Sequence, residues 1–221
     1  MISNDVVLVF TQRPARMQFP GHLTYKIVLL GDQCVGKSSL LNRFIKGSYC
    51  PHYIQTHGAE FFLKDMEVES NPVRLVLYDS MGQSNMKTIV RSIYRDAMGV
   101  MLVFDFNRAD TLQRVKEWLQ LIEQNCDIEP EKILVGNKMD LDEGMKKLTN
   151  KEVTEVAKSL ELDFIEVSAK TGYNVEEAFV TLVNNIFINR KRLRRDNMIT
   201  SIRLTDKPVR NRNLHKPDCC D

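Results

Sequence analysis

The sequence lacks the features that mark several classes of protein. No apolar run in its 221 residues approaches the roughly 18 residues that indicate a membrane-spanning helix. The first ten residues, MISNDVVLVF, have no leading basic residue and too short an apolar patch for a secretory signal peptide. No internal repeat is visible. Because 43% of the residues are hydrophobic, enough for a full-sized core, we expect a globular intracellular protein.

Cysteine is scarce, and its spacing matches no metal site. The chain has five cysteines, an odd number, and they are Cys34, Cys50, Cys126, Cys219 and Cys220. An isolated cysteine in a reducing compartment is usually a small apolar filler. The adjacent pair Cys219 and Cys220 differs, because it follows a basic segment next to the C-terminus.

Acidic residues are few at the C-terminal end. The net charge is +2, yet residues 190–221 hold ten of the 31 Lys and Arg and only four of the 29 acidic residues. A basic tail on a mildly acidic body predicts contact with an anionic partner, either a membrane or a nucleic acid. The basic run has no interleaved aromatic residues, which disfavours nucleic acid.

Apolar segments alternate with amphipathic ones along the chain. Strands are predicted at 25–30, 59–68, 73–79, 99–106, 132–136 and 163–168. Helices are predicted at about 38–46, 84–95, 110–124, 150–160 and 174–190, the fourth with a capping box at Thr149 and Glu152. This order predicts an α/β fold, with a mostly parallel six-stranded sheet flanked by about five helices. A tight turn at 69–72 makes the second strand antiparallel, at an edge of the sheet.

The two ends of the chain lack hydrophobic periodicity. We therefore divide it into a flexible N-terminal extension (1–22), one central domain (23–190) and a basic tail (191–221) that carries the cysteine pair.

A phosphate-binding loop follows the first predicted strand. The segment GDQCVGKSS fits the pattern G-x-x-x-x-G-K-[ST] between a strand and a helix, which is the context that this motif requires. Backbone N–H groups of such a loop surround phosphates, while Lys37 reaches the outer phosphates and the Ser38 hydroxyl binds Mg²⁺. The predicted nucleotide-binding residues are Gly31, Asp32, Gln33, Cys34, Val35, Gly36, Lys37, Ser38 and Ser39. The loop alone does not separate ATP from GTP.

A second motif selects guanine. Asn137, Lys138 and Asp140 follow the predicted strand at 132–136. The Asp140 carboxylate matches the N1–H and exocyclic amine of guanine, whereas adenine would leave this desolvated charge without donors. Asn137 orients the edge of the ring, and the stem of Lys138 lies over the base.

Residues 24–190 resemble a small GTPase of the Ras superfamily, most closely a Rab, without gaps from the phosphate loop to Phe61. The resemblance implies a P-loop NTPase fold, a molecular switch that hydrolyses GTP to GDP with Mg²⁺, and a role in vesicle and membrane trafficking. It implies that Ser38, Thr56 and Asp79 bind Mg²⁺. It also implies that Gly82 senses the γ-phosphate and that Gln83 orients the attacking water as the catalytic residue. Further nucleotide contacts are implied at Tyr49, Tyr53, Ser168, Ala169 and Lys170.

The second switch departs from the family pattern. Its segment YDSMGQS keeps the aspartate, glycine and glutamine, but Met81 replaces a small alanine. Gln33 stands where Ras proteins have glycine, and Cys34 replaces a residue that is often glycine or serine. Because a displacement of about 1 Å can cost on the order of 100-fold in rate, we expect slow hydrolysis that an activating protein accelerates by supplying an arginine.

Two other functions stay open. A scaffold that binds GTP without turnover is suggested by Gln33, Cys34 and Met81, and opposed by Gln83 and Thr56. A P-loop kinase would need an arginine-rich lid and an acceptor pocket, neither of which the sequence indicates, and the guanine motif contradicts it.

The expected partners follow from the resemblance. An exchange factor, an activating protein and effectors contact the two switch loops, and the effectors read Phe61, Tyr78 and Ile93, although Phe61 and Tyr78 could equally be ordinary sheet residues. The tail resembles that of a Rab, in which Cys219 and Cys220 receive geranylgeranyl groups. Two lipids and basic residues give a stable membrane anchor. Asp221 after the pair is a less common ending. We therefore expect a cytoplasmic monomer that cycles onto the cytosolic face of an endomembrane.

Overall fold

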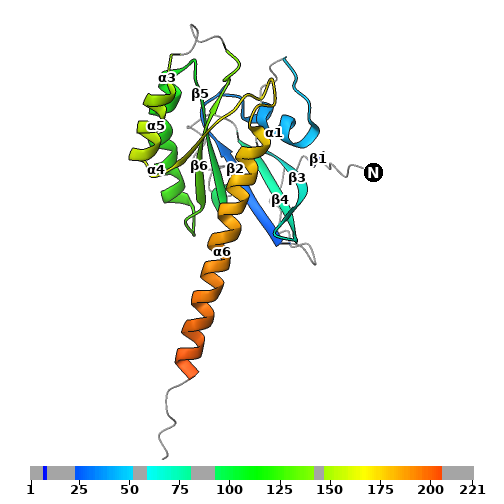
Figure 1. Cartoon of the computed structure of the whole chain (residues 1–221), viewed down its shortest axis with the longest axis vertical. Coiled ribbons are helices and arrows are strands. Elements are labelled where there is room, and N and C mark those ends of the chain that lie inside the picture. Colours follow the sequence, from blue (N-terminus) through cyan, green and yellow to red (C-terminus); the bar gives the residue numbers. More distant parts are fainter. Residues whose placement is uncertain (1–6, 9–22, 52–58, 81–92, 142–146, 206–221) are drawn as a thin grey trace, which may run out of the picture. The chain divides into compact units, whose positions relative to one another are not determined.

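In the part of the chain that the structure describes, seven strands form one sheet in the order β1-β3-β4-β2-β5-β6-β7 (Figure 1). The computed structural model describes residues 7–8, 23–51, 59–80, 93–141 and 147–205. The strands are β1 (Val7–Leu8), β2 (Leu23–Leu30), β3 (Ala59–Val68), β4 (Asn71–Ser80), β5 (Gly99–Asp105), β6 (Glu131–Asn137) and β7 (Asp163–Glu166). The helices are α1 (Lys37–Lys46), α3 (Ala109–Gln113), α4 (Val115–Asn125), α5 (Asn150–Ser159) and α6 (Val175–Thr205).

The six strands expected from the sequence are confirmed. Strand β2 pairs in parallel with β4 and β5, and β5, β6 and β7 continue in parallel. Strand β3 is antiparallel to β4, as the tight turn predicted, because Glu69 and Ser70 take the left-handed conformation between them. Strand β1 was not expected, because two residues are too short to signal a strand, and it pairs antiparallel with β3, with Val7 opposite Phe62. The edge position expected for the strand at 59–68 is therefore wrong, because β1 lies beyond β3.

Two apolar cores lie on opposite faces of the sheet. Along β2, Ile27 and Leu29 belong to one core, whereas Val28 and Leu30 belong to the other. This alternation is what the two-residue period of a strand imposes. The first core contains side chains of α1 and of α6 up to Phe187, and the second contains side chains of α4 and α5. A sheet buried on both faces places its loops, and not its faces, in reach of a ligand.

The helices mostly follow the sequence pattern. The capping box predicted at the start of α5 is confirmed, with Thr149 and Glu152 each bonded to the other's backbone N–H. The prediction of a single helix at 110–124 is wrong. A tight turn at Arg114, whose ψ is −6°, separates α3 from α4. Of the helix expected at 84–95, most lies outside the described residues, and Ile93 and Tyr94 are helical.

The last helix is longer than expected. We expected it to end at 190, but α6 continues to Thr205 because residues 191–205 contain no glycine or proline to stop it. The chain divides into two units, Met1–Phe187 and Ile188–Asp221. The first contains the sheet and both cores, and the described part of the second is helical. Within the described residues, no helix is both long and apolar enough to cross a membrane.

Candidate nucleotide site

The residues predicted to bind nucleotide lie where strands end at one edge of the sheet. The phosphate loop follows β2, Asp79 lies near the end of β4, Asn137 ends β6, and Ser168 follows β7. These four strands are parallel, so their carboxyl ends share one edge. In open α/β sheets this edge is where ligands bind. The fold therefore brings together two motifs that are 100 residues apart in the sequence.

The phosphate loop is held close to the rest of the domain. Gly31 has φ of 141°, and a Cβ there would lie 2.0 Å from the carbonyl oxygen of Val103. Gly36 has φ of 99°, and its Cβ would lie 2.2 Å from Nδ2 of Asn137. Only glycine is tolerated at either position. Cys34 also lies in the left-handed region, with φ of 65°, at a cost of about 1 kcal/mol for a residue with a side chain.

Lys37 is buried at the base of this loop. Its Nζ donates to the carbonyl oxygens of Gly31 at 2.9 Å and of Asp32 at 2.8 Å. Burial lowers the pKa of Lys37 to about 8, although the carboxylates of Asp79 and Asp32 act in the opposite direction. The ammonium group is thus held among loop carbonyls, in the place from which this residue type reaches phosphates.

Two of the three predicted Mg²⁺ ligands lie side by side. The hydroxyl of Ser38 donates to Oδ2 of Asp79 at 2.5 Å, and Asp79 is buried. A hydroxyl and a carboxylate are hard oxygen donors of the kind that Mg²⁺ prefers, so these residues fit the ion. The described residues contain no group of three or more His, Cys, Asp or Glu that could hold a metal. A Mg²⁺ ion bound by Ser38 and Asp79 would therefore take its remaining ligands from phosphate oxygens and water.

Asn137 joins the two motifs. Its Nδ2 donates to the carbonyl oxygen of Val35 at 2.8 Å, and its Oδ1 accepts from the N–H of Ala169 at 3.1 Å. It is buried, so both bonds lie away from solvent. One side chain therefore fixes the phosphate loop against the segment Ser168–Lys170.

Asp140 is held by the same segment. Its Oδ1 accepts from the hydroxyl of Ser168 at 2.6 Å, and its Oδ2 lies 3.5 Å from Nζ of Lys170. Burial alone would raise the pKa of Asp140, but the bond from Ser168 and the Lys170 ammonium outweigh it, so the pKa lies below its ordinary value. The group is a carboxylate at neutral pH, as recognition of two guanine donors requires.

Lys138 has a buried partner that the sequence did not indicate. Its Nζ donates to Oδ2 of Asp105 at 2.6 Å, and Asp105 is buried at the end of β5. Thr111 accepts from the N–H of Asp105 and donates to the carbonyl oxygen of Arg108. The signal that could have revealed Asp105 is its position, since it ends β5 as Asp79 comes near the end of β4.

Comparison with known proteins identifies the family. The model of the Ras family matches residues 26–188. The Ras-related protein RAB1BV of Beta vulgaris is 36% identical over 173 residues, which are 78% of this chain and 80% of that protein. Ras-related protein Rab-8B of Dictyostelium discoideum is 37% identical over 176 residues, covering 80% and 84%. Ras-related protein Rab-13 of Rattus norvegicus is 32% identical over 192 residues, covering 85% and 94%. The chain belongs to the Ras family.

Because these relatives are Rab proteins, the chain is a Rab-like small GTPase. As such, it binds guanine nucleotide, hydrolyses GTP and takes part in membrane trafficking. The scaffold without turnover has no better support among these matches than an active enzyme has. The P-loop architecture expected for the sheet and its flanking helices is confirmed.

Several predicted site residues of this GTPase lie outside the described residues. They are Tyr53, Thr56, Gly82, Gln83, Cys219 and Cys220. Met81 is also outside. Among the described residues, Tyr49 is exposed, Val35 is buried in the first core, and Ser39 is half-buried on the first turn of α1.

The residues expected to contact effectors of this Rab-like GTPase are largely covered. Phe61 is 3% exposed and Ile93 is 8% exposed, whereas Tyr78 is half-buried. The rings of Phe61 and Tyr78 lie 5.7 Å apart, and Nζ of Lys26 lies 4.8 Å from the centre of the Tyr78 ring. Of these three side chains, Tyr78 is the most accessible in this conformation.

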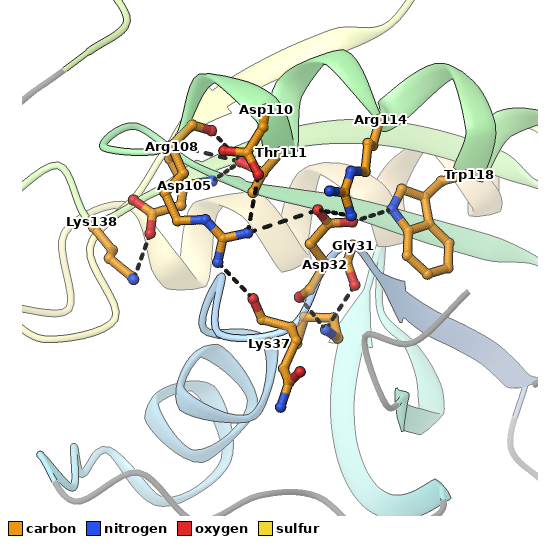
Figure 2. A network of polar contacts seen from close by, with 11 residues as sticks. Gly31, Asp32, Lys37, Asp105, Arg108, Asp110, Thr111, Arg114, Trp118 and Lys138 are labelled. Carbon is orange, nitrogen blue, oxygen red and sulfur yellow. Dashed lines mark hydrogen bonds and ion pairs between the residues drawn. The ribbon is translucent and has the colours of Figure 1, made fainter. Parts of the chain in front are cut away.

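A cluster around Asp32 was also missed by sequence reasoning, which gave this residue only a backbone role. Its carboxylate lies among Arg108 from the turn after β5, Arg114 from the turn between α3 and α4, and Trp118 from α4 (Figure 2). No motif marks these residues, because their encounter depends on how α4 packs on the sheet.

Proposed function

We propose that this GTPase is a two-state switch in which one edge of the sheet both recognises guanine and reports the third phosphate. The observation that supports it most directly is the carboxylate of Asp140, kept ionised and held by Ser168 on the same edge as the phosphate loop. Guanine offers two adjacent donors to such a carboxylate, and adenine does not. The base side is completed by Asn137, Lys138, Ala169 and Lys170, with Tyr49 stacked on the base. Tyr53 is a further nucleotide contact.

The phosphates lie in the loop of residues 31–39. Lys37 exchanges its carbonyl partners for oxygens of the outer phosphates, because an ammonium gains more from a phosphate than from neutral carbonyls. Ser38, Asp79 and Thr56 would hold Mg²⁺, and the ion would supply positive charge to the phosphate oxygens during hydrolysis. The hydroxyl–carboxylate pair at 2.5 Å supports this assignment for the first two residues.

Gln83 orients the attacking water, and Thr56 and Gly82 respond to the γ-phosphate. Hydrolysis is slow without an activating protein, which contributes an arginine. Single-turnover hydrolysis of bound GTP tests this role. We expect Gln83→Leu to slow the rate by at least roughly 10-fold, in line with a lost water-orienting group. Equal hydrolysis rates for the wild type and Gln83→Leu would show that Gln83 has no catalytic role.

The nucleotide retained after purification separates turnover from the scaffold alternative. Bound GDP is expected for a working GTPase, and bound GTP would indicate a protein that does not turn over. Bound adenine nucleotide would contradict both readings and the role of Asp140.

The basic tail anchors the GTPase to the cytosolic face of an endomembrane through geranylgeranyl groups on Cys219 and Cys220. Exchange factor, activating protein and effectors act at the switch loops of a monomer, and effectors read Phe61, Tyr78 and Ile93 after the loops rearrange. The domain of residues 23–190 would carry the switch, and residues 191–221 the anchor. Partition of protein prenylated in vitro into detergent, compared with Cys219→Ser/Cys220→Ser, tests the anchor. Identical partition would exclude it.

A further inference from the structure

The phosphate loop contains a buried negative charge. The side chain of Asp32 is 5% exposed, and its backbone carbonyl accepts the bond from Lys37. A carboxylate at this depth repels phosphates that bind a few residues away, because charges interact strongly where water is excluded. A loop that holds a nucleotide therefore needs the Asp32 charge to be compensated.

Two arginines and a tryptophan compensate it, as Figure 2 shows. Arg114 Nη1 lies 3.2 Å from Oδ2 of Asp32, and Arg108 Nη2 lies 3.8 Å from the same oxygen. Neither guanidinium is aligned for a hydrogen bond to Oδ2, so these contacts are ionic. Trp118 Nε1 donates to Oδ1 at 3.2 Å. Both oxygens of the carboxylate are thus faced by donors from α4, from the turn between α3 and α4, and from the turn that precedes α3.

Arg108 also holds the loop directly. Its Nη1 donates to the carbonyl oxygen of Gln33 at 2.9 Å. A phosphate loop binds its ligand through N–H groups, so bonds to its carbonyl oxygens leave the N–H groups available. The same arginine lies 3.5 Å from Asp110, in the first turn of the helix α3 that follows it, and this contact restrains the guanidinium. The α3–α4 segment therefore holds the loop by its carbonyl side and by its one acidic side chain.

We propose that Arg114 and Arg108 are positioning residues of the phosphate loop, which neutralise Asp32 and thereby slow the release of bound nucleotide. The proposal depends on the proposed phosphate-binding role of residues 31–39. Removal of one arginine leaves the carboxylate under-compensated, so its repulsion acts on the phosphates and on the loop. We expect release of GDP to be about 10-fold faster in Arg114→Gln, which corresponds to about 1.4 kcal/mol.

The test is the dissociation rate of a fluorescent GDP analogue from the full chain with Mg²⁺ present. The variants are Arg114→Gln, Asp32→Asn and the double variant. Removal of the carboxylate removes the need for its partner, so the double variant should release nucleotide at the rate of Asp32→Asn alone. If Arg114→Gln accelerates release equally in both backgrounds, Asp32 does not mediate its effect and the proposal is overturned.

Arg95→Gln is the matched control. Arg95 lies 3.2 Å from Asp127, the same distance as in the Arg114 pair, but both side chains are exposed, at 69% and 59%. Its loss should leave release unchanged, because exposed pairs contribute little. If Arg95→Gln and Arg114→Gln accelerate release alike, a general effect of charge loss replaces the proposal. If Arg114→Gln does not fold, Arg114→Lys replaces it in the test. Release of the GDP analogue from Arg114→Lys at nearly the wild-type rate supports a role for the charge of Arg114. Release that is about 10-fold faster than wild type contradicts that role.

Competition with GDP and GMP separates positioning from a general loss of structure. An effect on the phosphate loop weakens GDP more than GMP, because GDP places an additional phosphate in the loop. Equal weakening of both would overturn the proposal. If the wild-type chain binds neither nucleotide, the proposed function fails instead. If it binds both and all variants behave as wild type, only the inference about the arginines fails.

Discussion

The proposed base end and the proposed phosphate end of the site are built differently. At the base end, Asp140 and Asn137 are each bonded to the segment that starts at Ser168, with distances of 2.6 and 3.1 Å. At the phosphate end, the ammonium of Lys37 is bonded to carbonyl oxygens of its own loop. In the proposed site, a base would enter the first end with few changes, whereas a phosphate would displace the carbonyl partners of Lys37 at the second. Preorganisation favours tight recognition, and exchange of partners favours a response to the ligand.

Asp140→Asn tests the base end and should have the largest effect. The amide keeps the shape and an acceptor for Ser168, but it lacks the charge and replaces one acceptor with a donor. We expect the affinity for GDP to fall by at least about 100-fold, since a site built around specific donors rejects a mismatch strongly. Titration with fluorescent GDP measures this loss.

Xanthosine diphosphate is the control for Asp140→Asn. Xanthine has a carbonyl where guanine has its exocyclic amine, so it matches an amide that donates at that point. The variant should therefore bind xanthosine diphosphate better than the wild type does. Unchanged affinity for GDP would show that Asp140 does not contact the base, and that the base does not bind at this end of the site.

Lys37→Met tests the phosphate end. The variant removes the ammonium that would contact the outer phosphates, so we expect roughly 30-fold weaker GDP binding, in the range of a charge-assisted bond. GMP should be affected less than GDP, in contrast to Asp140→Asn, which should weaken both equally. Competition experiments with the two nucleotides give the ratio. An equal loss for GDP and GMP would mean that Lys37 does not distinguish them.

The thermal stability of nucleotide-free Lys37→Met gives an independent measurement. Burial holds the pKa of Lys37 at about 8, so the folded protein bears a cost for this ammonium. Replacement by an apolar side chain of similar length should leave the melting temperature unchanged or raise it. A clear fall in the melting temperature would show that the hydrogen bonds to Gly31 and Asp32 contribute more than the burial of the ammonium costs. Lys37 would then stabilise the fold of the nucleotide-free protein.

Ser168→Ala is a smaller change at the base end. The variant removes the bond of 2.6 Å to Asp140 and the acceptor for the N–H of Thr171. We expect about 5-fold weaker binding, from a net contribution of about 1 kcal/mol for one hydrogen bond. GDP and GMP should lose affinity to the same extent, as measured by the same competition. A larger loss for GDP would mean that the two ends are coupled through this segment.

Local patterns allowed much of this site to be predicted. The capping box at Thr149 spans three residues, and the two nucleotide motifs follow strands whose apolar runs are unmistakable. Because parallel strands share one carboxyl edge, a mostly parallel sheet places Asp79, Asn137 and Ser168 at the same edge. These predictions rest on short-range chemistry and on a topology that the order of strands and helices already implies.

What could not be predicted depends on packing over long distances. The carboxylate of Asp32 meets Trp118, which is 86 positions away, only because α4 lies against the sheet at that point. The break at Arg114 and the bond from Lys138 to Asp105 arise in the same way. The length of α6 could not be predicted for another reason. Hydrophobic periodicity is absent from residues 191–221, but residues 191–205 contain no glycine or proline that would stop the helix.

Substitution of Lys26 should have the smallest effect, and it is a control for Lys37→Met. It donates to the carbonyl oxygen of Arg95 at 2.7 Å, and burial lowers its pKa to about 8 from 10.5, against the opposing charge of Asp96. It lies near the start of β2, whereas the phosphate loop follows the end of that strand, so no phosphate reaches it. Lys26→Met should therefore leave nucleotide affinity unchanged, unlike Lys37→Met.

The stability of Lys26→Met should differ from wild type in a pH-dependent way. Between pH 8 and 10.5 the unfolded chain holds this proton while the folded protein has lost it, so stability of the wild type rises with pH in that window. The variant lacks this contribution. We expect urea unfolding to show the wild type gaining on the order of 1 kcal/mol relative to Lys26→Met from pH 7 to 10, after allowance for partial solvent exposure. A constant difference across this range would show that Lys26 titrates normally, and the burial of an ammonium would then cost no more here than at the surface.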